Sequence, residues 1–112
     1  MTDYPAPRSL QIENQFCAAI RERQIVQLRY KDDVSWRLFA PHAVFHSSTE
    51  KVLVTGTQVE NPSKPWDRYE PRNFEIGLIK AMTLTDDKFT PDHRFNSRDE
   101  RYSHGVICAV DR

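Results

Sequence analysis

The stretch LRYKDDVSWRLFAP, residues 28–41, alternates apolar and polar side chains on both sides of an acidic pair. Successive side chains of a β-strand point to opposite faces of a sheet, so a half-buried strand shows this alternation. Adjacent acidic residues between two such runs are typical of a connecting turn. The stretch therefore predicts an antiparallel β-hairpin that turns at Asp32 and Asp33.

Pairing across this turn is expected to bury the apolar rows of both strands. The row of the second strand consists of Val34, Trp36, Leu38 and Ala40. Arg29, Ser35 and Arg37 would then lie together on the outer face of the hairpin. Two guanidinium groups and a hydroxyl are good donors to a phosphate or a carboxylate. The cluster is either an anion-binding site or an ordinary solvated strand face.

The rest of the chain predicts a mainly β domain of the α+β class. Ser9 is expected to cap a helix that ends near Arg23, because apolar side chains recur there every three to four residues. Short segments rich in β-branched and aromatic residues follow. They are IVQLRYK, VSWRLFA, HAVFHS, KVLVTGTQ, NFEIGLI and AMTLTD. We predict a small antiparallel β-barrel of about five strands with an N-terminal amphipathic helix.

Composition limits the possible classes of protein. The 112 residues suffice for one domain, and 16 basic side chains balance 16 acidic ones. This balance lacks the net positive field of a strong, sequence-blind nucleic-acid binder. No apolar run is long enough for a membrane span, and the first residues lack the pattern of a secretory signal. Because Cys17 and Cys108 are few and far apart, we expect reduced thiols and a cytoplasmic location.

Residues 1–8 are expected to form a flexible lead, and residues 9–112 a single domain with a polar C-terminal extension. Residues 90–104 are highly charged and show no period. The apolar run GVICAV, residues 105–110, follows them. This run is predicted either to complete the chain's own sheet or to pair with another chain in a homodimer.

The loop NPSKPWDRYEP, residues 61–71, places Trp66 and Tyr69 among the arginines Arg68 and Arg72. Interleaved aromatic and arginine side chains are able to stack a base or to anchor a protein interface. The alternative is that they pack the loop onto the end of the barrel.

Nothing in the sequence indicates an enzyme, a cofactor or a metal site. A glycine-rich phosphate loop is absent. Four residues of strand would separate His42 from His46 by about 13 Å, too far for one metal ion. Cys17 lies within the predicted helix, where a thiol is ordinarily a small core residue. We therefore expect a non-catalytic protein.

The order of four segments resembles the WYL domain family. They are AAIRERQIVQLRYKDD, VSWRLFAPHAVF, EKVLVTG and RNFEIGLIKAMTLTD, and the resemblance spans about residues 14–89. It implies an SH3-like, Sm-like β-barrel. WYL domains are usually attached to bacterial helix-turn-helix regulators, in which they are thought to sense nucleic acid or nucleotide-like ligands.

The chain departs from the WYL pattern at two places. Lys51-Val52-Leu53 stands where the family has Trp-Tyr-Leu, and the segment 74–79 lacks both arginines of the family pattern. Glu75 replaces one of them and is expected to neutralise Arg29 or Arg37. A helix-turn-helix segment does not precede the resemblance, so the chain looks like a stand-alone WYL-like domain.

From these observations we expect a ligand-sensing or regulatory domain, with a possible regulator protein as partner. The expected ligand is a small anionic or nucleotide-like molecule or single-stranded nucleic acid. The candidate binding surface consists of Arg29, Ser35, Arg37, Trp66, Arg68 and Arg72. The alternative is a protein-interaction or self-association module that uses the 61–71 loop and the C-terminal strand.

Overall fold

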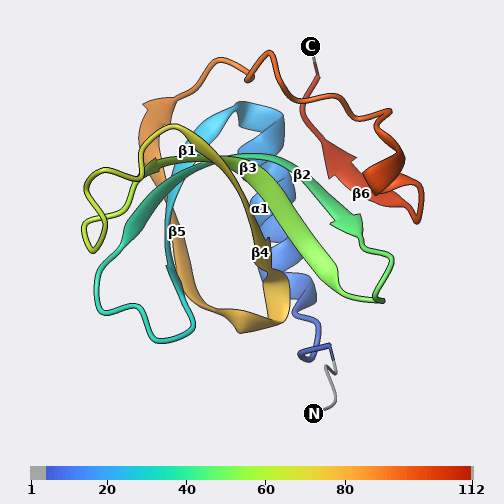
Figure 1. Ribbon diagram of the computed structural model, residues 1–112, viewed down its shortest axis with the longest axis horizontal. Coiled ribbons are helices and arrows are strands. Elements are labelled where there is room, and N and C mark those ends of the chain that lie inside the picture. Colours follow the sequence, from blue (N-terminus) through green and yellow to red (C-terminus); the bar gives the residue numbers. More distant parts are fainter. Residues whose placement is uncertain (1–4, 112) are drawn as a thin grey trace.

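A computed structural model describes residues 5–111 and shows one helix against a strongly bent antiparallel sheet (Figure 1). The helix is α1 (Leu10–Glu22). The strands are β1 (Gln24–Tyr30), β2 (Arg37–His46), β3 (Val52–Glu60), β4 (Glu70–Glu75), β5 (Ile79–Lys88) and β6 (Val106–Ala109). Two 3₁₀ turns complete the elements, η1 (Ile76–Leu78) and η2 (Glu100–Tyr102). The predicted mainly β, α+β class is confirmed.

The strands follow the order β4-β3-β2-β1-β5, and β6 pairs with β2 beyond the end of β1. Strands β4 and β5 are the two ends of this order, and no ladder joins them within residues 5–111. The sheet is therefore not closed, and a complete barrel is not confirmed. The run GVICAV does complete the chain's own sheet, because Val44 of β2 pairs with Cys108 of β6.

The hairpin has a different register from the one predicted. Leu28 pairs with Arg37, and Val26 pairs with Phe39. Directly paired residues point to the same face, so Arg37 lies on the buried side of β1, opposite to Arg29. Phe39 is buried in the second strand, whereas Val34 is 87% exposed. The prediction was wrong because residues 31–36 all belong to the connection, so that β2 begins only at residue 37.

Helix α1 follows its sequence signals. The Ser9 side chain accepts a hydrogen bond from the Ile12 N–H at 3.2 Å, and the backbone of Arg23 ends the helix with a φ of 54°. Phe16 and Ile20 are buried against the sheet, as the periodicity predicts. Glu13 of the helix is only 2% exposed, and it pairs with Arg8 at 2.7 Å. The lead segment supplies its counter-charge.

The expectation of a flexible lead falls partly on residues 1–4, which lie outside the described residues. Residues 5–8 contact the sheet end: the Ala6 N–H donates to Glu75 Oε2 at 2.6 Å. The carbonyl oxygen of Pro7 lies 2.4 Å from the position that a Cβ would take on Gly77. Only glycine therefore allows the backbone of the lead to approach η1 this closely.

Cys17 of α1 and Cys108 of β6 form a disulfide, 91 residues apart in the sequence. The expectation of two reduced thiols is corrected by this pairing. The sequence does not predict this disulfide, since it forms only because β6 pairs with β2 and contacts α1. Among the described residues, no helix has the length and apolar character needed to cross a membrane.

Candidate functional site

The predicted cationic cluster is divided between the two faces of the sheet. The Arg29 guanidinium lies over the Trp36 ring at 5.1 Å. Arg37, on the other face, lies over the Phe74 ring at 5.4 Å. Ser35 belongs to the connection between β1 and β2. The structure therefore does not bring Arg29 and Arg37 together as one anion site.

Arg37 belongs to a hydrogen-bonded chain that reaches the 61–71 loop. It donates to Asp33 and, from Nη1, to Gln58 Oε1 at 3.1 Å. Gln58, which is fully buried, donates to Asp67 Oδ2 at 2.8 Å, and Asp67 also pairs with Arg72. Two of the arginines predicted to bind an anion are thus already paired with acids of the same chain.

The pKa values of the two acids show the same neutralisation. Burial acts to raise the pKa of Asp33, but hydrogen bonds from Arg37 and from the Tyr30 N–H hold it below its ordinary value. The hydrogen bond from Arg72 is the main cause that lowers the pKa of Asp67. Glu75 was predicted to neutralise Arg29 or Arg37. In the structure Asp33 pairs with Arg37 instead, and Glu75 accepts a hydrogen bond from the lead segment.

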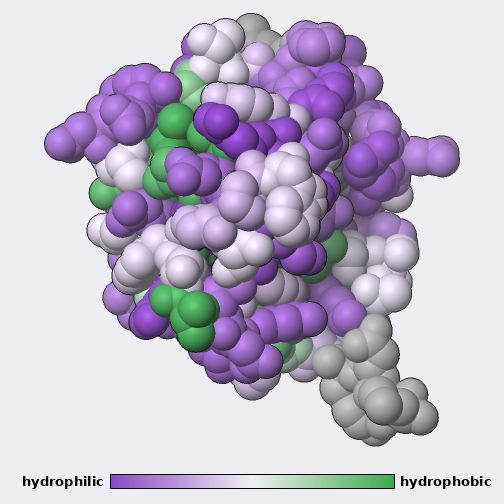
Figure 2. Space-filling model, turned by 60° about the vertical axis from the view of Figure 1, so that its left-hand side comes forward, coloured by the Kyte–Doolittle hydropathy of each residue, from purple (hydrophilic) through white to green (hydrophobic). Residues whose placement is uncertain are grey.

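The 61–71 loop presents the most exposed aromatic side chains near these arginines. Trp66 is 80% exposed and Tyr69 is 58% exposed. The Arg68 guanidinium lies 5.2 Å from the centre of the Tyr69 ring. We call Trp66, Arg68 and Tyr69 the loop surface. Figure 2 brings this side of the molecule forward and shows a mainly hydrophilic face on which hydrophobic residues form small, separate patches.

A network of hydrogen bonds ties the loop surface to the C-terminal extension. Asp92 accepts from Arg94 Nη2 at 2.7 Å and from Thr57 Oγ1 at 2.9 Å. Arg94 Nη2 also donates to the Tyr69 carbonyl at 3.0 Å. The hydrogen bonds that Arg94 donates to the Asp92 carboxylate are the main reason that the pKa of Asp92 is well below its usual range. The network fixes the position of Tyr69 against β3.

His42 completes this network from a bulge in β2. Pro41 pairs with Gly56 and Ala43 with Thr55, so His42 is the extra residue between them. Its Nε2 accepts from the Asp92 N–H at 2.8 Å, and its Nδ1 lies 2.8 Å from the Ala40 carbonyl. Both bonds together require that Nδ1 carries the proton. The histidine is therefore a buried anchor for the segment around Asp92.

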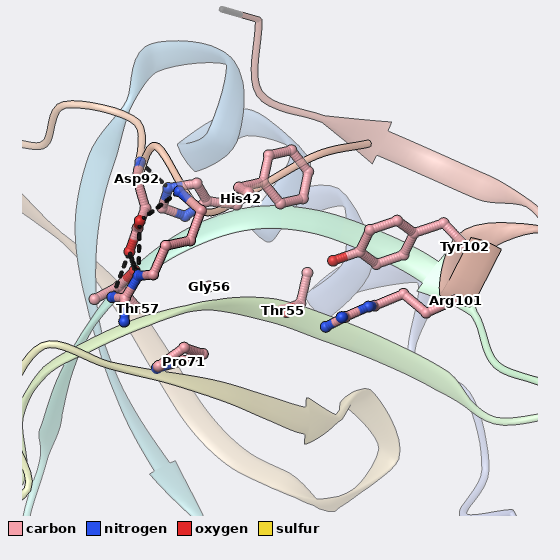
Figure 3. Close-up of a pocket in the computed structure, with 10 residues that line it drawn as sticks. His42, Thr55, Gly56, Thr57, Pro71, Asp92, Arg101 and Tyr102 are labelled. Carbon is pink, nitrogen blue, oxygen red and sulfur yellow. Dashed lines mark hydrogen bonds and ion pairs between the residues drawn. The ribbon is translucent and has the colours of Figure 1, made fainter. Parts of the chain in front are cut away.

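Cavities open on both sides of the network. One, of about 770 Å³, lies between Tyr69 of the loop and Phe89 and Pro91 of the extension. The other, of about 220 Å³, is shown in Figure 3, with Arg101 and Tyr102 at one end. Burial raises the pKa of the Tyr102 hydroxyl, which points into this pocket (Figure 3).

The site residues of the extension were not predicted from the sequence, because residues 90–104 have no strand or helix period. A local signal was nevertheless present: the pattern Asp-x-Arg occurs twice, at 92–94 and at 99–101. In each, the aspartate accepts from the backbone N–H and the guanidinium two residues later. Within residues 5–111 there is no group of three His, Cys, Asp or Glu side chains that would hold a metal ion.

Comparisons with known proteins show a likeness of fold. No family model and no curated protein matches the chain. Among solved structures, the proteasome accessory factor B/C (PafBC) of Arthrobacter aurescens is similar, with a TM-score of 0.60 and 15% sequence identity over 89% of this chain. The matched part is 16% of the PafBC chain. The described helix and strands thus have the arrangement of one part of a larger protein.

Proposed function

We propose that this chain is a non-catalytic regulatory domain that binds a small anionic or nucleotide-like ligand, or single-stranded nucleic acid, at the loop surface. The observation that carries the proposal is the exposure of Trp66 and Tyr69 on one loop, with the Arg68 guanidinium over the Tyr69 ring. An aromatic ring offers a face for a base, and stacking contributes roughly 1–3 kcal/mol per base. Arg68 supplies donors for a phosphate.

The backbone that carries these side chains is well anchored, which favours binding. Asp67 is tied to Gln58 and Arg72, and the Tyr69 carbonyl is tied to Arg94. The Tyr69 N–H also donates to the Gln58 carbonyl at 2.6 Å. A site held in place before the ligand arrives loses less conformational entropy on binding.

The regulatory part of the proposal rests on two likenesses. Residues 14–89 resemble WYL domains, which are usually attached to bacterial regulators, and the described fold is similar to part of PafBC. A regulator protein with its own DNA-reading module is accordingly the partner that we propose. The separation of Arg29 from Arg37 and the pairing of Arg72 move the proposed site toward Trp66 and Arg68.

Tryptophan fluorescence tests the proposal. A panel of mononucleotides and short oligonucleotides should quench the emission of the chain, and Trp66→Ala and Arg68→Gln should each weaken binding about tenfold or more. Trp36→Phe is the matched control, because the Trp36 ring contacts Arg29 and belongs to the connection between β1 and β2. Equal losses for Trp36→Phe and Trp66→Ala, or no quenching by any member of the panel, would refute binding at the loop surface.

One observation favours a protein-interaction module as the second candidate. Trp66 is mostly exposed, and exposed tryptophans are frequent anchors of protein interfaces. The C-terminal strand is less suited to this role, because β6 already pairs with β2. Sedimentation over a range of concentrations distinguishes the candidates: self-association that Trp66→Ala abolishes would support the module, and a monomer throughout would exclude a homodimer.

A further inference from the structure

The pocket of Figure 3 shares Asp92 and Arg94 with the cavity beside Tyr69, but no residue of the loop surface lines it. Its floor is β3 at residues 55–57, and its far wall is the extension at residues 92–102. Because residues 90–104 lie beyond the part that resembles WYL domains, the pocket is not accounted for by that resemblance.

Two arginines approach the pocket from opposite ends. Arg94 is held by Asp92 and Arg101 by Asp99, at 2.7 Å and 3.1 Å. Arg101 uses Nε for its bond to Asp99, and its guanidinium extends over Thr55 (Figure 3). Neither Nη1 nor Nη2 of Arg101 donates to a protein acceptor within residues 5–111. The guanidinium lines the pocket, so Nη1 and Nη2 are open to an acceptor there.

The acids that face the pocket do not block an anion there. Asp92 accepts from the Arg94 guanidinium, the Arg94 N–H and Thr57, so its charge is neutralised within the network. Asp99 accepts from the Arg101 backbone and Nε, and it is not among the residues that line the pocket. The recognition of an anion would come from directed N–H donors rather than from net charge.

The remaining walls favour an organic ligand over a bare ion. Phe95 and Pro71 line the pocket with apolar surface, and Tyr102 adds a ring whose hydroxyl points inward. The volume of about 220 Å³ has room for a ligand of roughly seven to ten non-hydrogen atoms. A small ring or short chain with one carboxylate has this size.

We propose that this pocket binds a small organic acid, with its carboxylate on Arg101 and its apolar body against Phe95 and Pro71. The hydroxyls of Thr55 and Tyr102, which hydrogen-bond each other, add neutral polar groups beside the carboxylate. The site is distinct from the loop surface, so a failure of either proposal leaves the other standing.

Benzoate and benzamide form a matched pair of probes, because they share a ring and differ in charge. In amide NMR spectra of the intact, oxidised chain, benzoate should shift the signals of residues 55–57 and 101–102. The affinity for benzamide should be lower by about tenfold or more, since benzamide lacks the charge that pairs with the guanidinium. Cyclohexanecarboxylate should behave like benzoate.

Two arginine variants from the same segment provide the decisive comparison. Arg101→Gln should weaken benzoate binding about tenfold, whereas Arg98→Gln should leave it unchanged, because Arg98 does not line the pocket. Arg101 is exposed, so its replacement should keep a dispersed, folded spectrum. Equal affinity for benzoate and benzamide, equal loss in both variants, or the absence of shifts at millimolar acid would overturn the proposal. Inorganic phosphate that bound as tightly as benzoate would also contradict the role of the apolar walls.

Discussion

Arg37 Nε lies 2.7 Å from Asp33 Oδ2, and the two side chains are 19% and 17% exposed. Asp33 Oδ2 also accepts from the Tyr30 N–H at 2.9 Å. The pair therefore joins the last residue of β1 to the first residue of β2 and fixes the connection between the strands. An arginine that the sequence suggests as a ligand-binding group serves instead to hold the hairpin in register.

Replacement of Arg37 should therefore lower stability. Arg37→Ala leaves Asp33 and Gln58 without a charged donor, and the free energy of unfolding should fall by roughly 2 kcal/mol. Urea denaturation followed by far-UV circular dichroism measures this change. Arg98→Ala, in an exposed position, should change it by less than about 0.5 kcal/mol. A silent Arg37→Ala would show that the pair does not stabilise the hairpin.

The Cys17–Cys108 disulfide should make the chain more stable under oxidising conditions. A link across 91 residues restricts the unfolded chain, which in the chain-entropy model stabilises the folded state by about 4 kcal/mol. Addition of a reductant should lower the urea midpoint accordingly, and the double variant Cys17→Ala/Cys108→Ala should not respond to it. Titration of free thiols in the native, oxidised chain should find none, and two reactive thiols would contradict the pairing.

Gly56 should not tolerate a side chain. A Cβ at this position would lie 2.1 Å from the Ala40 carbonyl oxygen and 2.8 Å from the Phe39 ring. Gly56→Ala should therefore separate β2 from β3 and reduce the free energy of unfolding by about 2–3 kcal/mol. Thr83→Ala on the exposed face of β5 serves as the control, and similar effects of the two substitutions on the urea midpoint would argue against the close approach.

Local signals predicted the elements that depend on neighbouring residues alone. Ser9 caps α1, Phe16 and Ile20 face the core, and the apolar segments became strands because each has its own period. The register of the hairpin was not predictable in this way, since the length of its connection depends on the ion pair of Asp33 with Arg37. Because the pairing register of β2 differs by one residue from the predicted one, each β2 side chain lies on the opposite face of the sheet from the predicted face.

Contacts between distant residues account for what the sequence did not reveal. Glu13 is buried because Arg8 neutralises it, and Cys17 meets Cys108 because β6 extends the edge that β1 begins. The pocket residues come from a segment without a period, so their approach to β3 follows from the Asp92 network rather than from any strand pattern. Trp66 and Arg68 of the loop surface were predicted as candidate binding residues, whereas the exposure of Trp66 and Tyr69 comes from the structure.

The Asp92 network should make stability depend on pH in the acidic range. The pKa of Asp92 is well below its usual value in the folded chain, chiefly through hydrogen bonds from Arg94, while the unfolded chain should have a value near 4. The carboxylate therefore stabilises the fold above about pH 4, and this contribution is lost as the pH falls toward the folded pKa. Protonation would remove the acceptor that holds Arg94 and Thr57.

A comparison of Asp92→Asn with the unmodified chain isolates this contribution. At pH 7 the variant should be less stable by roughly 1–3 kcal/mol, because the guanidinium and the hydroxyl lose a charged acceptor. The difference should shrink as the pH falls from about 4 toward 2, since Asp92 of the unfolded unmodified chain then takes up a proton that the folded chain does not bind, whereas the asparagine of the variant does not titrate. Asp86→Asn, in an exposed position of β5, should match the unmodified chain over the same range. The lowered pKa values of Asp33, Asp67 and Asp99 affect all three proteins alike, so they cancel in the comparison. If the difference between Asp92→Asn and the unmodified chain stays constant from pH 7 to pH 2, the charge of Asp92 does not hold the extension against β3.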